Sequence, residues 1–337
     1  MPPIQPLDHA AILPRLLAMQ AAIRSELRAH MQAQQAEVWS RTVRDDAGDT
    51  VFGIDAAVED LLLARCEEWG RTQAFTLLAE GLDPAGVAFG APGRGGPPFR
   101  LLVDPIDGTR GLMFDKRSAW CLMAVAPDRG AATRMSDVAI AAMTELPTTR
   151  QATSDALWAV RGGGAHGTRT DLSNGATRPL PVVPSRADTL RHGFATVCDF
   201  FQGGKALVAE LAEAIYARAL GPWNAQKAEV YADQYISSGG QLAELALGRD
   251  RFVLDVRPLV HQKLGAKSSL ACRPYDVCTA LVAQEAGCVV LDPFGGPLDA
   301  PLDVVSSVAF AAYANRALAE RMVPIVREET LRRFGGG

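Results

Sequence analysis

Two aspartates stand three residues apart in the stretch VDPIDGT, at Asp104 and Asp107, where an apolar run ends. Two carboxylates so close together repel each other unless a cation or a proton lies between them. Pro105 interrupts a regular β-ladder, so the chain is expected to leave a sheet at Asp104. Gly108 permits close backbone approach, and Thr109 can cap a helix or hold a water. The stretch therefore predicts either a polar turn or a site where a cation meets an anion.

Two further carboxylates occupy comparable positions. Glu80 follows the apolar run AFTLLA, and Asp276 opens a helix after CRPY. Exposure alone would explain Glu80, and helix capping alone would explain Asp276. Together with Asp104 and Asp107 they make four carboxylates at the ends of separate elements, an all-oxygen set that suits Mg²⁺. The five histidines lie far apart without zinc spacing, so the pattern does not favour zinc.

The composition limits the classes of partner. The chain has 337 residues, 48% of them hydrophobic, and a formal net charge of −4, which predicts a globular protein with no basic surface for a nucleic-acid polymer. Six dispersed cysteines without a C-x-x-C pair are typical of reduced thiols. The first residues lack a signal-peptide pattern, and no run reaches about 18 apolar residues. We therefore expect a cytoplasmic protein that does not interact with membranes.

Hydrophobic periodicity predicts a mixture of helices and strands, and therefore a layered α/β (α+β) fold. In the first half we expect helices at 10–34 and 54–69 and strands at 74–80, 99–104, 119–127 and 137–146. Residues 155–169 are expected to form another strand that runs into a glycine-rich turn. In the second half we expect strands at 194–198, 251–256, 288–291 and 302–307 and helices at 205–220, 241–248, 276–287 and 312–326. A Pro/Ser/Arg-rich segment near 170–193 predicts a domain boundary, which divides the chain into 1–180 and 181–337, with the metal site at their junction.

The motif DPIDGT, with a strand-end Glu before it and PYDVCTALVAQEAGCVV after it, resembles the inositol monophosphatase family of metal-dependent, lithium-sensitive sugar and polyol phosphatases. Three more stretches match in the same order: GIDAAVEDLLL, AVRGGGAHG and SSGGQLAELALGRDRF. The resemblance spans roughly residues 40–310. It implies a layered αβαβα sandwich of the inositol monophosphatase and fructose-bisphosphatase type, a homodimer, and hydrolysis of a small sugar, polyol or nucleotide-type phosphate.

The resemblance also implies a set of metal ligands. Glu80, Asp104 and the carbonyl oxygen of Ile106 would hold one Mg²⁺. Asp104, Asp107 and Asp276 would hold the second, and the site would take two or three ions. Asp104 would then bridge the cations.

The catalytic roles follow from the same resemblance. Thr109, oriented by Asp55, would help Glu80 to position and deprotonate the attacking water. The amides of Gly108 and Thr109 would bind phosphate oxygens. Asp255, at the end of a strand, would accept hydrogen bonds from substrate hydroxyls, although a plain strand-end carboxylate explains it equally well.

The sequence departs from the family pattern at several points. Gly81 replaces a second glutamate, Tyr275 replaces a tryptophan, and Cys288 replaces a glycine. Residues 110–112 differ from those that usually follow Gly-Thr. An insertion at 256–273 brings basic side chains that form either a solvated loop or a contact to a second anionic group on the substrate.

Two other function classes compete with a phosphatase. An inactive binding or regulatory member of the same fold would be expected to lose ligands, whereas all four carboxylates, Asp55 and Thr109 are present. A nucleotide-dependent kinase or ATPase would need a phosphate loop ending in Gly-Lys-Ser/Thr, and neither GAPGRGGPP nor RGGGAHG supplies one.

Overall fold

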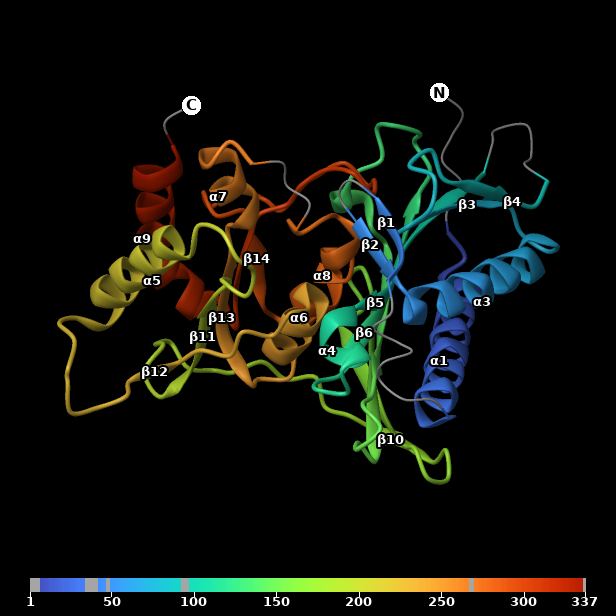
Figure 1. The fold of residues 1–337 in the computed structure, drawn as a ribbon, viewed down its shortest axis with the longest axis horizontal. Helices are drawn as coiled ribbons and strands as arrows, with labels where there is room; N and C mark the ends of the chain where they lie inside the picture. The colour runs from blue at the N-terminus through green and yellow to red at the C-terminus, as the bar shows by residue number, and fades with distance from the viewer. Residues whose placement is uncertain (1–6, 34–41, 47–48, 92–96, 267–269, 336–337) are drawn as a thin grey trace.

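The computed structural model describes residues 7–33, 42–46, 49–91, 97–266 and 270–335. Two helices, a large sheet, two further helices, a smaller sheet and a last pair of helices follow one another across the molecule (Figure 1). The predicted layered α/β fold is therefore confirmed. None of the described helices combines the length and the apolar character that crossing a membrane requires.

The large sheet has eight strands and carries the DPIDGT segment near its centre. In spatial order its strands are β10 (Thr177–Pro179), β9 (Ala165–Asp171), β8 (Thr153–Val160), β7 (Ile140–Leu146), β6 (Ala119–Pro127), β5 (Phe99–Asp107), β3 (Phe75–Ala79) and β4 (Val87–Phe89). Only the β3–β5 pair is parallel in this sheet. Its register places Ala79 opposite Val103, so the residues that follow, Glu80 and Asp104, emerge side by side.

The smaller sheet has five strands, all from the second half of the chain. Their spatial order is β12 (Val230–Tyr231), β11 (Gly193–Val197), β13 (Asp250–Asp255), β15 (Phe310–Tyr313) and β14 (Val289–Leu291). A separate hairpin joins β1 (Thr42–Asp46) to β2 (Asp49–Phe52) near the start of the chain.

The described helices form the layers around the sheets. They are α1 (His9–Ala33), α3 (Gly53–Gly70), α4 (Thr109–Met113), α5 (Lys205–Leu220), α6 (Ser238–Ala246), α7 (Arg257–Lys263), α8 (Ala280–Ala286) and α9 (Arg316–Phe334). Helices α1 and α3 cover one face of the large sheet, α6 and α8 lie between the sheets, and α5 and α9 cover the outer face of the smaller sheet (Figure 1).

Three apolar clusters hold these layers together. One joins α1 and α3 to the large sheet, a second fills the space between the sheets around α6 and α8, and a third joins α5 and α9 to the smaller sheet. Helix α1 shows why the sequence folds this way. Its periodic apolar residues Ile12, Leu16 and Ile23 are fully buried. Pro14 lies near its start, where a missing N–H costs least.

Most predicted elements are confirmed within a few residues, but one strand was wrong. The apolar alternation at 302–307 forms no strand, and the pairing strand is β15 instead, whose last two residues were assigned to the closing helix. Leu302 is buried all the same, because it packs in the cluster between the sheets. An alternating pattern indicates which side chains are buried, and here those side chains lie on an irregular segment instead of a strand.

The prediction that the chain leaves the sheet at Asp104 also needs correction. Strand β5 continues to Asp107, which pairs with Trp120 of β6, after a register shift between the two aspartates. Pro105 and Ile106 form the irregular part of this ladder, and the proline lacks the N–H that regular pairing would use. The irregularity alters the direction of the strand between two carboxylates.

The two sheets come from successive parts of the chain, residues 75–179 and 193–313. Helices α6 and α8 from the later part nevertheless pack on strands of the large sheet. The division into domains 1–180 and 181–337 therefore stays a prediction.

Candidate metal centre

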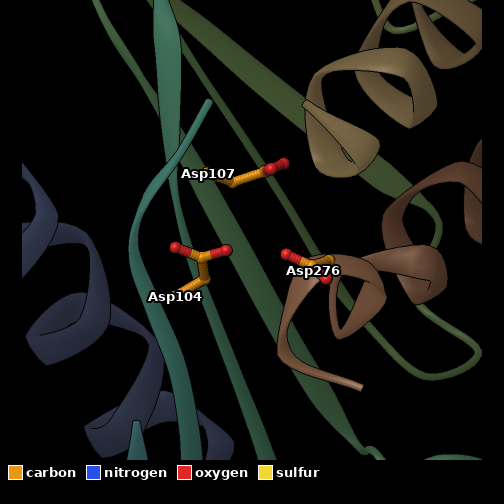
Figure 2. Close-up of side chains that lie close together, drawn as sticks. All are labelled: Asp104, Asp107 and Asp276. Carbon is orange, nitrogen blue, oxygen red and sulfur yellow. The ribbon is translucent and has the colours of Figure 1, made fainter. Parts of the chain in front are cut away.

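Three carboxylates meet where the large sheet faces α6 and the segment before α8. Asp104 and Asp107 come from β5, and Asp276 comes from a short 3₁₀-helix, Tyr275–Val277 (Figure 2). One oxygen atom from each residue lies within 4.8 Å of the others. Asp104 is 1% exposed and Asp107 is 6% exposed. The structure thus brings together three of the four predicted carboxylates, although Asp107 and Asp276 lie far apart in the sequence.

Helix α6 holds Asp107 in place. The hydroxyl of Ser237, the N-cap residue, donates to Oδ2 of Asp107 at 2.8 Å. The amide of Gly239 donates to the same oxygen at 2.6 Å, and that of Ser238 donates to Oδ1 at 3.3 Å. Glycine at position 239 allows this close approach, because a Cβ there would lie 2.6 Å from Leu122 and 2.9 Å from the Asp107 carboxylate, so that these side chains would have to shift. Amides at a helix N-terminus stabilise a negative charge.

Asp104 and Asp276 are oriented mainly by their own local backbone. The amide of Ile106 donates to Oδ1 of Asp104 at 3.0 Å, which closes an Asx-type turn over Pro105. The amide of Arg273 donates to Oδ2 of Asp276 at 2.5 Å. Both carboxylates are therefore fixed before any ligand binds.

Burial raises the pKa values of all three carboxyls, and neighbouring carboxylates add to the rise for Asp104 and Asp107. Burial, followed by the charges of Glu80, Asp107 and Asp276, raises the pKa of Asp104 well above its ordinary range. Burial and Asp276 raise the pKa of Asp107 to about 8, despite the hydrogen bonds from α6. Burial raises the pKa of Asp276 to about 6, while the hydrogen bond from Arg273 and the charge of Arg257 limit the rise. The group lacks enough positive charge of its own to remain fully ionised at neutral pH.

Glu80 lies beside this group rather than within it. Its charge contributes to the raised pKa of Asp104, and the hydroxyl of Tyr275 is 3.5 Å from its Oε1. Gly81 stands where the family pattern has a second glutamate. Its φ of 80° is a backbone conformation that glycine adopts without strain and that other residues rarely adopt. The nearest side-chain oxygen to a Cβ at that position, at 3.8 Å, is Oε2 of Glu59.

Thr109 connects the DPIDGT turn to helix α3. Its hydroxyl lies 2.8 Å from the carbonyl oxygen of Ile106 and 3.2 Å from Oδ1 of Asp55. Gly108 precedes it as the N-cap of α4, with a φ of 103°. A Cβ on Gly108 would lie 3.1 Å from the carbonyl oxygen of Ile236, so the close approach to the α6 segment also requires glycine.

Asp255 occupies a different environment from the predicted one. It is fully buried, and Nε and Nη2 of Arg257 bind its two oxygens at 2.6–2.9 Å. Arg257 continues to Oγ of Ser238 at 3.3 Å and to the carbonyl oxygen of Leu270 at 2.9 Å. The predicted contact of Asp255 with substrate hydroxyls therefore stays a prediction, and the geometry favours a role in positioning Arg257.

Comparison with known proteins shows which solved structures share this architecture. No protein-family model matches the chain, and no curated protein matches it. Solved structures do match over nearly the whole chain. The extragenic suppressor protein SuhB from Bartonella henselae superposes with a TM-score of 0.63 at 15% identity, covering 94% of this chain and 99% of that one.

Two more structures agree with this match. Leishmania major fructose-1,6-bisphosphatase has a TM-score of 0.65 at 13% identity, with 93% of each chain covered. The Thermotoga maritima IMPase has a TM-score of 0.59 at 16% identity, covering 95% of this chain and 99% of that one. The chain has the inositol monophosphatase fold. At these identities the fold alone is shared, so the chemistry must be argued from the site.

The sequence analysis did not identify the residues that hold the carboxylates of this site in place. The stretch SSGG was recognised as part of a match, but its Ser and Gly were given no role, although their hydroxyl and amide groups bind Asp107. Ser before Gly-Gly at a helix start was a readable N-cap signal. The pairing of Arg257 with Asp255 had a weaker signal, namely opposite charges two residues apart across a strand end.

Proposed function

We propose that this protein is a Mg²⁺-dependent phosphomonoesterase acting on a small sugar, polyol or nucleotide-type phosphate. The observation that carries the proposal is the buried group of Asp104, Asp107 and Asp276, whose oxygens lie within 4.8 Å of one another beside the Gly108–Thr109 turn. Buried like charges are costly unless a cation neutralises them. All the donors are oxygens, which suits Mg²⁺ better than softer metals.

The proposed ligands follow from the geometry and the resemblance. Asp104, Asp107 and Asp276 would hold one ion, and Asp104, Glu80 and the Ile106 carbonyl would hold another. When bound, such ions polarise phosphate oxygens and lower the pKa of a coordinated water. Glu80 supports the second set, since it is close enough to Asp104 to raise the pKa of that carboxyl.

The remaining residues would orient the reactants and move the proton. Thr109, restrained by Asp55 and Ile106, would hold the attacking water, and Glu80 would accept its proton. The amides of Gly108 and Thr109, at a helix start without intrahelical acceptors, would donate to phosphate oxygens. In-line attack would then release the alcohol.

Phosphate release from a panel of sugar, polyol and nucleotide monophosphates, with Mg²⁺ and with EDTA, tests the proposal. We expect turnover of at least one ester that requires Mg²⁺ and disappears in Asp104→Asn. Lithium inhibition and a homodimer in solution are further parts of the proposal, checked by adding LiCl to the assay and by light scattering. Metal-independent turnover, or equal turnover by the variant, would contradict the assignment.

The alternative is a catalytically inactive member of this fold that binds a phosphorylated ligand. It predicts that calorimetry detects Mg²⁺-dependent binding of a panel member while no phosphate is released. The hydrogen bonds of Thr109 favour the enzyme, because binding alone does not require a hydroxyl placed between Asp55 and the turn.

A further inference from the structure

An aromatic pair links two arginines beside the metal centre. Phe200 and Phe201 follow the end of β11, and their rings meet edge to face with centroids 5.0 Å apart. The Arg257 guanidinium lies 4.6 Å from the Phe200 ring centroid and 5.6 Å from that of Phe201. The Arg110 guanidinium also contacts this pair, at 5.3 Å from the Phe201 ring centroid. One aromatic side chain therefore contacts two guanidinium groups from separate elements.

The two arginines differ in what neutralises them. Arg257 is paired with buried Asp255 and also donates to Ser238 and Leu270, so its hydrogen-bonding capacity is largely used within the protein. Arg110 makes no ion pair and no side-chain hydrogen bond with any other residue in the described part of the chain, and its side chain rests on Phe201. A guanidinium held against a ring keeps its outer N–H groups available for an anion.

Arg110 is also tied closely to the metal centre. It follows Thr109 directly, in the first turn of α4. A series of contacts also connects Arg110 to Asp107. The amide of Ser238 binds Asp107, the hydroxyl of Ser238 contacts Arg257, and Arg257 stacks on the ring pair that touches Arg110. Arg110 is thus linked to the carboxylate group both along the chain, through Thr109, and through the ring pair and Arg257.

We infer that Arg110, supported by Phe201, binds a second anionic group on the leaving-group side of the substrate. The inference rests on the proposed phosphatase function and narrows its substrates to phosphomonoesters that carry another phosphate or a carboxylate. Guanidinium forms paired hydrogen bonds with either group, so the shared chemistry is an oxyanion. The metal and phosphate contacts treat all phosphomonoesters alike, so this contact would decide among them.

Matched esters test the inference. Glucose 1-phosphate, glucuronic acid 1-phosphate and glucose 1,6-bisphosphate present a hydroxyl, a carboxylate and a phosphate at the same position. We expect the wild-type protein to show a higher kcat/KM for one or both anionic esters than for glucose 1-phosphate. In Arg110→Ala this preference should fall by about 10- to 100-fold, mainly through KM, as expected for a lost hydrogen bond to a charged group. The ester that loses most identifies carboxylate or phosphate as the group bound.

Two variants and one control separate binding from stacking. Arg110→Lys keeps the charge without the planar fork and should lose part of the preference, and Phe201→Leu should lose part of it by releasing the guanidinium. Arg316→Ala is the matched control, because Arg316 is 88% exposed on α9 and pairs with Glu320. No preference in the wild-type protein, or a preference that Arg110→Ala leaves intact, would overturn the inference.

A binding measurement keeps the inference testable if the phosphatase proposal fails. Calorimetric titration with the phosphonate analogues of the three esters, in Mg²⁺, needs no turnover. Weaker binding of the anionic analogues to Arg110→Ala than to the wild-type protein would support Arg110 even if no ester is hydrolysed. Equal binding of all three analogues to both proteins would exclude it, whatever the activity.

Discussion

The hydroxyl of Ser237 caps helix α6 and binds the carboxylate of Asp107 at the same time. It accepts a hydrogen bond from the amide of Gly240 at 2.8 Å and donates one to Oδ2 of Asp107 at 2.8 Å. A single side chain thus fixes the start of a helix between the two sheets and the carboxylate at the end of strand β5 in the large sheet. The centre is therefore coupled to the packing of the sheets across α6, and small changes in that helix should reach the site.

Replacing Ser237 with alanine should weaken both functions. Loss of the cap is expected to lower the free energy of unfolding by about 1 kcal/mol. Loss of the donor to Asp107 should weaken Mg²⁺ binding by about 10-fold, as for other residues that orient metal ligands. Urea denaturation and a Mg²⁺ titration measure the two effects. Ser25→Ala, whose hydroxyl bonds only to the Ala21 carbonyl within α1, serves as the control and should change neither.

Asp104→Asn should abolish Mg²⁺-dependent turnover while leaving the fold intact. The change removes a buried carboxyl whose ionisation is opposed by burial and by its neighbours, so we expect the metal-free variant to be as stable as the wild-type protein or more stable by about 1 kcal/mol. Circular dichroism and urea denaturation in EDTA report stability, and phosphate release reports activity. A strongly destabilised variant would mean that Asp104 supports the fold instead.

The metal-free protein should lose stability as the pH rises through neutrality. The pKa of Asp276 is raised to about 6 and that of Asp107 to about 8, both from an ordinary value of 3.8. A carboxyl with a raised pKa favours the folded state only while it is protonated, so its contribution is complete below about pH 4 and disappears as the pH passes the raised values. The free energy of unfolding in EDTA should therefore fall between about pH 5 and 8.5.

Mg²⁺ should remove much of this pH dependence, because bound cations neutralise the ionised carboxylates. Asp250 is buried outside this group, and burial raises its pKa to about 7. It therefore contributes a part of the pH dependence of stability that Mg²⁺ does not remove. Asp250→Asn should reduce the pH dependence of stability that remains in Mg²⁺ and leave the Mg²⁺-dependent part unchanged. Melting curves in EDTA and in Mg²⁺ across this pH range measure both parts. The same slope with and without Mg²⁺ would argue against a cation at the carboxylates.

Periodicity in the sequence predicted the layers well, because each helix and strand buries a recognisable face. Helix α5 begins and ends where predicted, and so does strand β6. The misplaced strand at 302–307 and the overlooked helix α7 share a physical cause. Both lie where burial comes from contacts with distant elements, which a local pattern does not report.

The candidate site could be predicted only as far as short motifs reach. DPIDGT located Asp104, Asp107 and Thr109, since a turn with two carboxylates is visible locally. The placement of Asp276 beside them came from the resemblance, because nothing local connects it to β5. The pairing of Asp255 with Arg257 depends on how α7 leaves the strand, and the Phe201–Arg110 contact joins α4 to the distant segment after β11. Neither can be read from spacing.

Asp255→Ala should destabilise the protein rather than alter substrate choice alone. Asp255 is fully buried and the Arg257 side chain is 11% exposed, so removal of one partner leaves a buried charge and should cost about 3–5 kcal/mol. Asp188→Ala breaks an exposed pair with Arg321 and should cost less than about 1 kcal/mol. Urea denaturation distinguishes the two. A stable Asp255→Ala protein that loses kcat/KM only on polyol phosphates would restore the predicted hydroxyl contact.

Thr109→Val tests whether the hydroxyl between Asp55 and the turn takes part in the reaction. Valine keeps the shape of threonine and removes the group that lies 3.2 Å from Asp55 and 2.8 Å from the Ile106 carbonyl. If this hydroxyl positions the attacking water, kcat should fall about 100-fold or more with little change in KM. Thr109→Ser should recover most of the activity, and Asp55→Asn should fall between the two.

The matched control for Thr109 is Thr149, whose hydroxyl bonds to Asp115 at 2.6 Å on an exposed segment. Thr149→Val removes a comparable hydrogen bond and should leave kcat unchanged. Steady-state kinetics on the best panel substrate, with melting curves for all four variants, separates catalysis from folding. If Thr109→Val turns over normally, Thr109 only braces the turn against α3, and the water must be positioned by Glu80 and the carboxylate group without it.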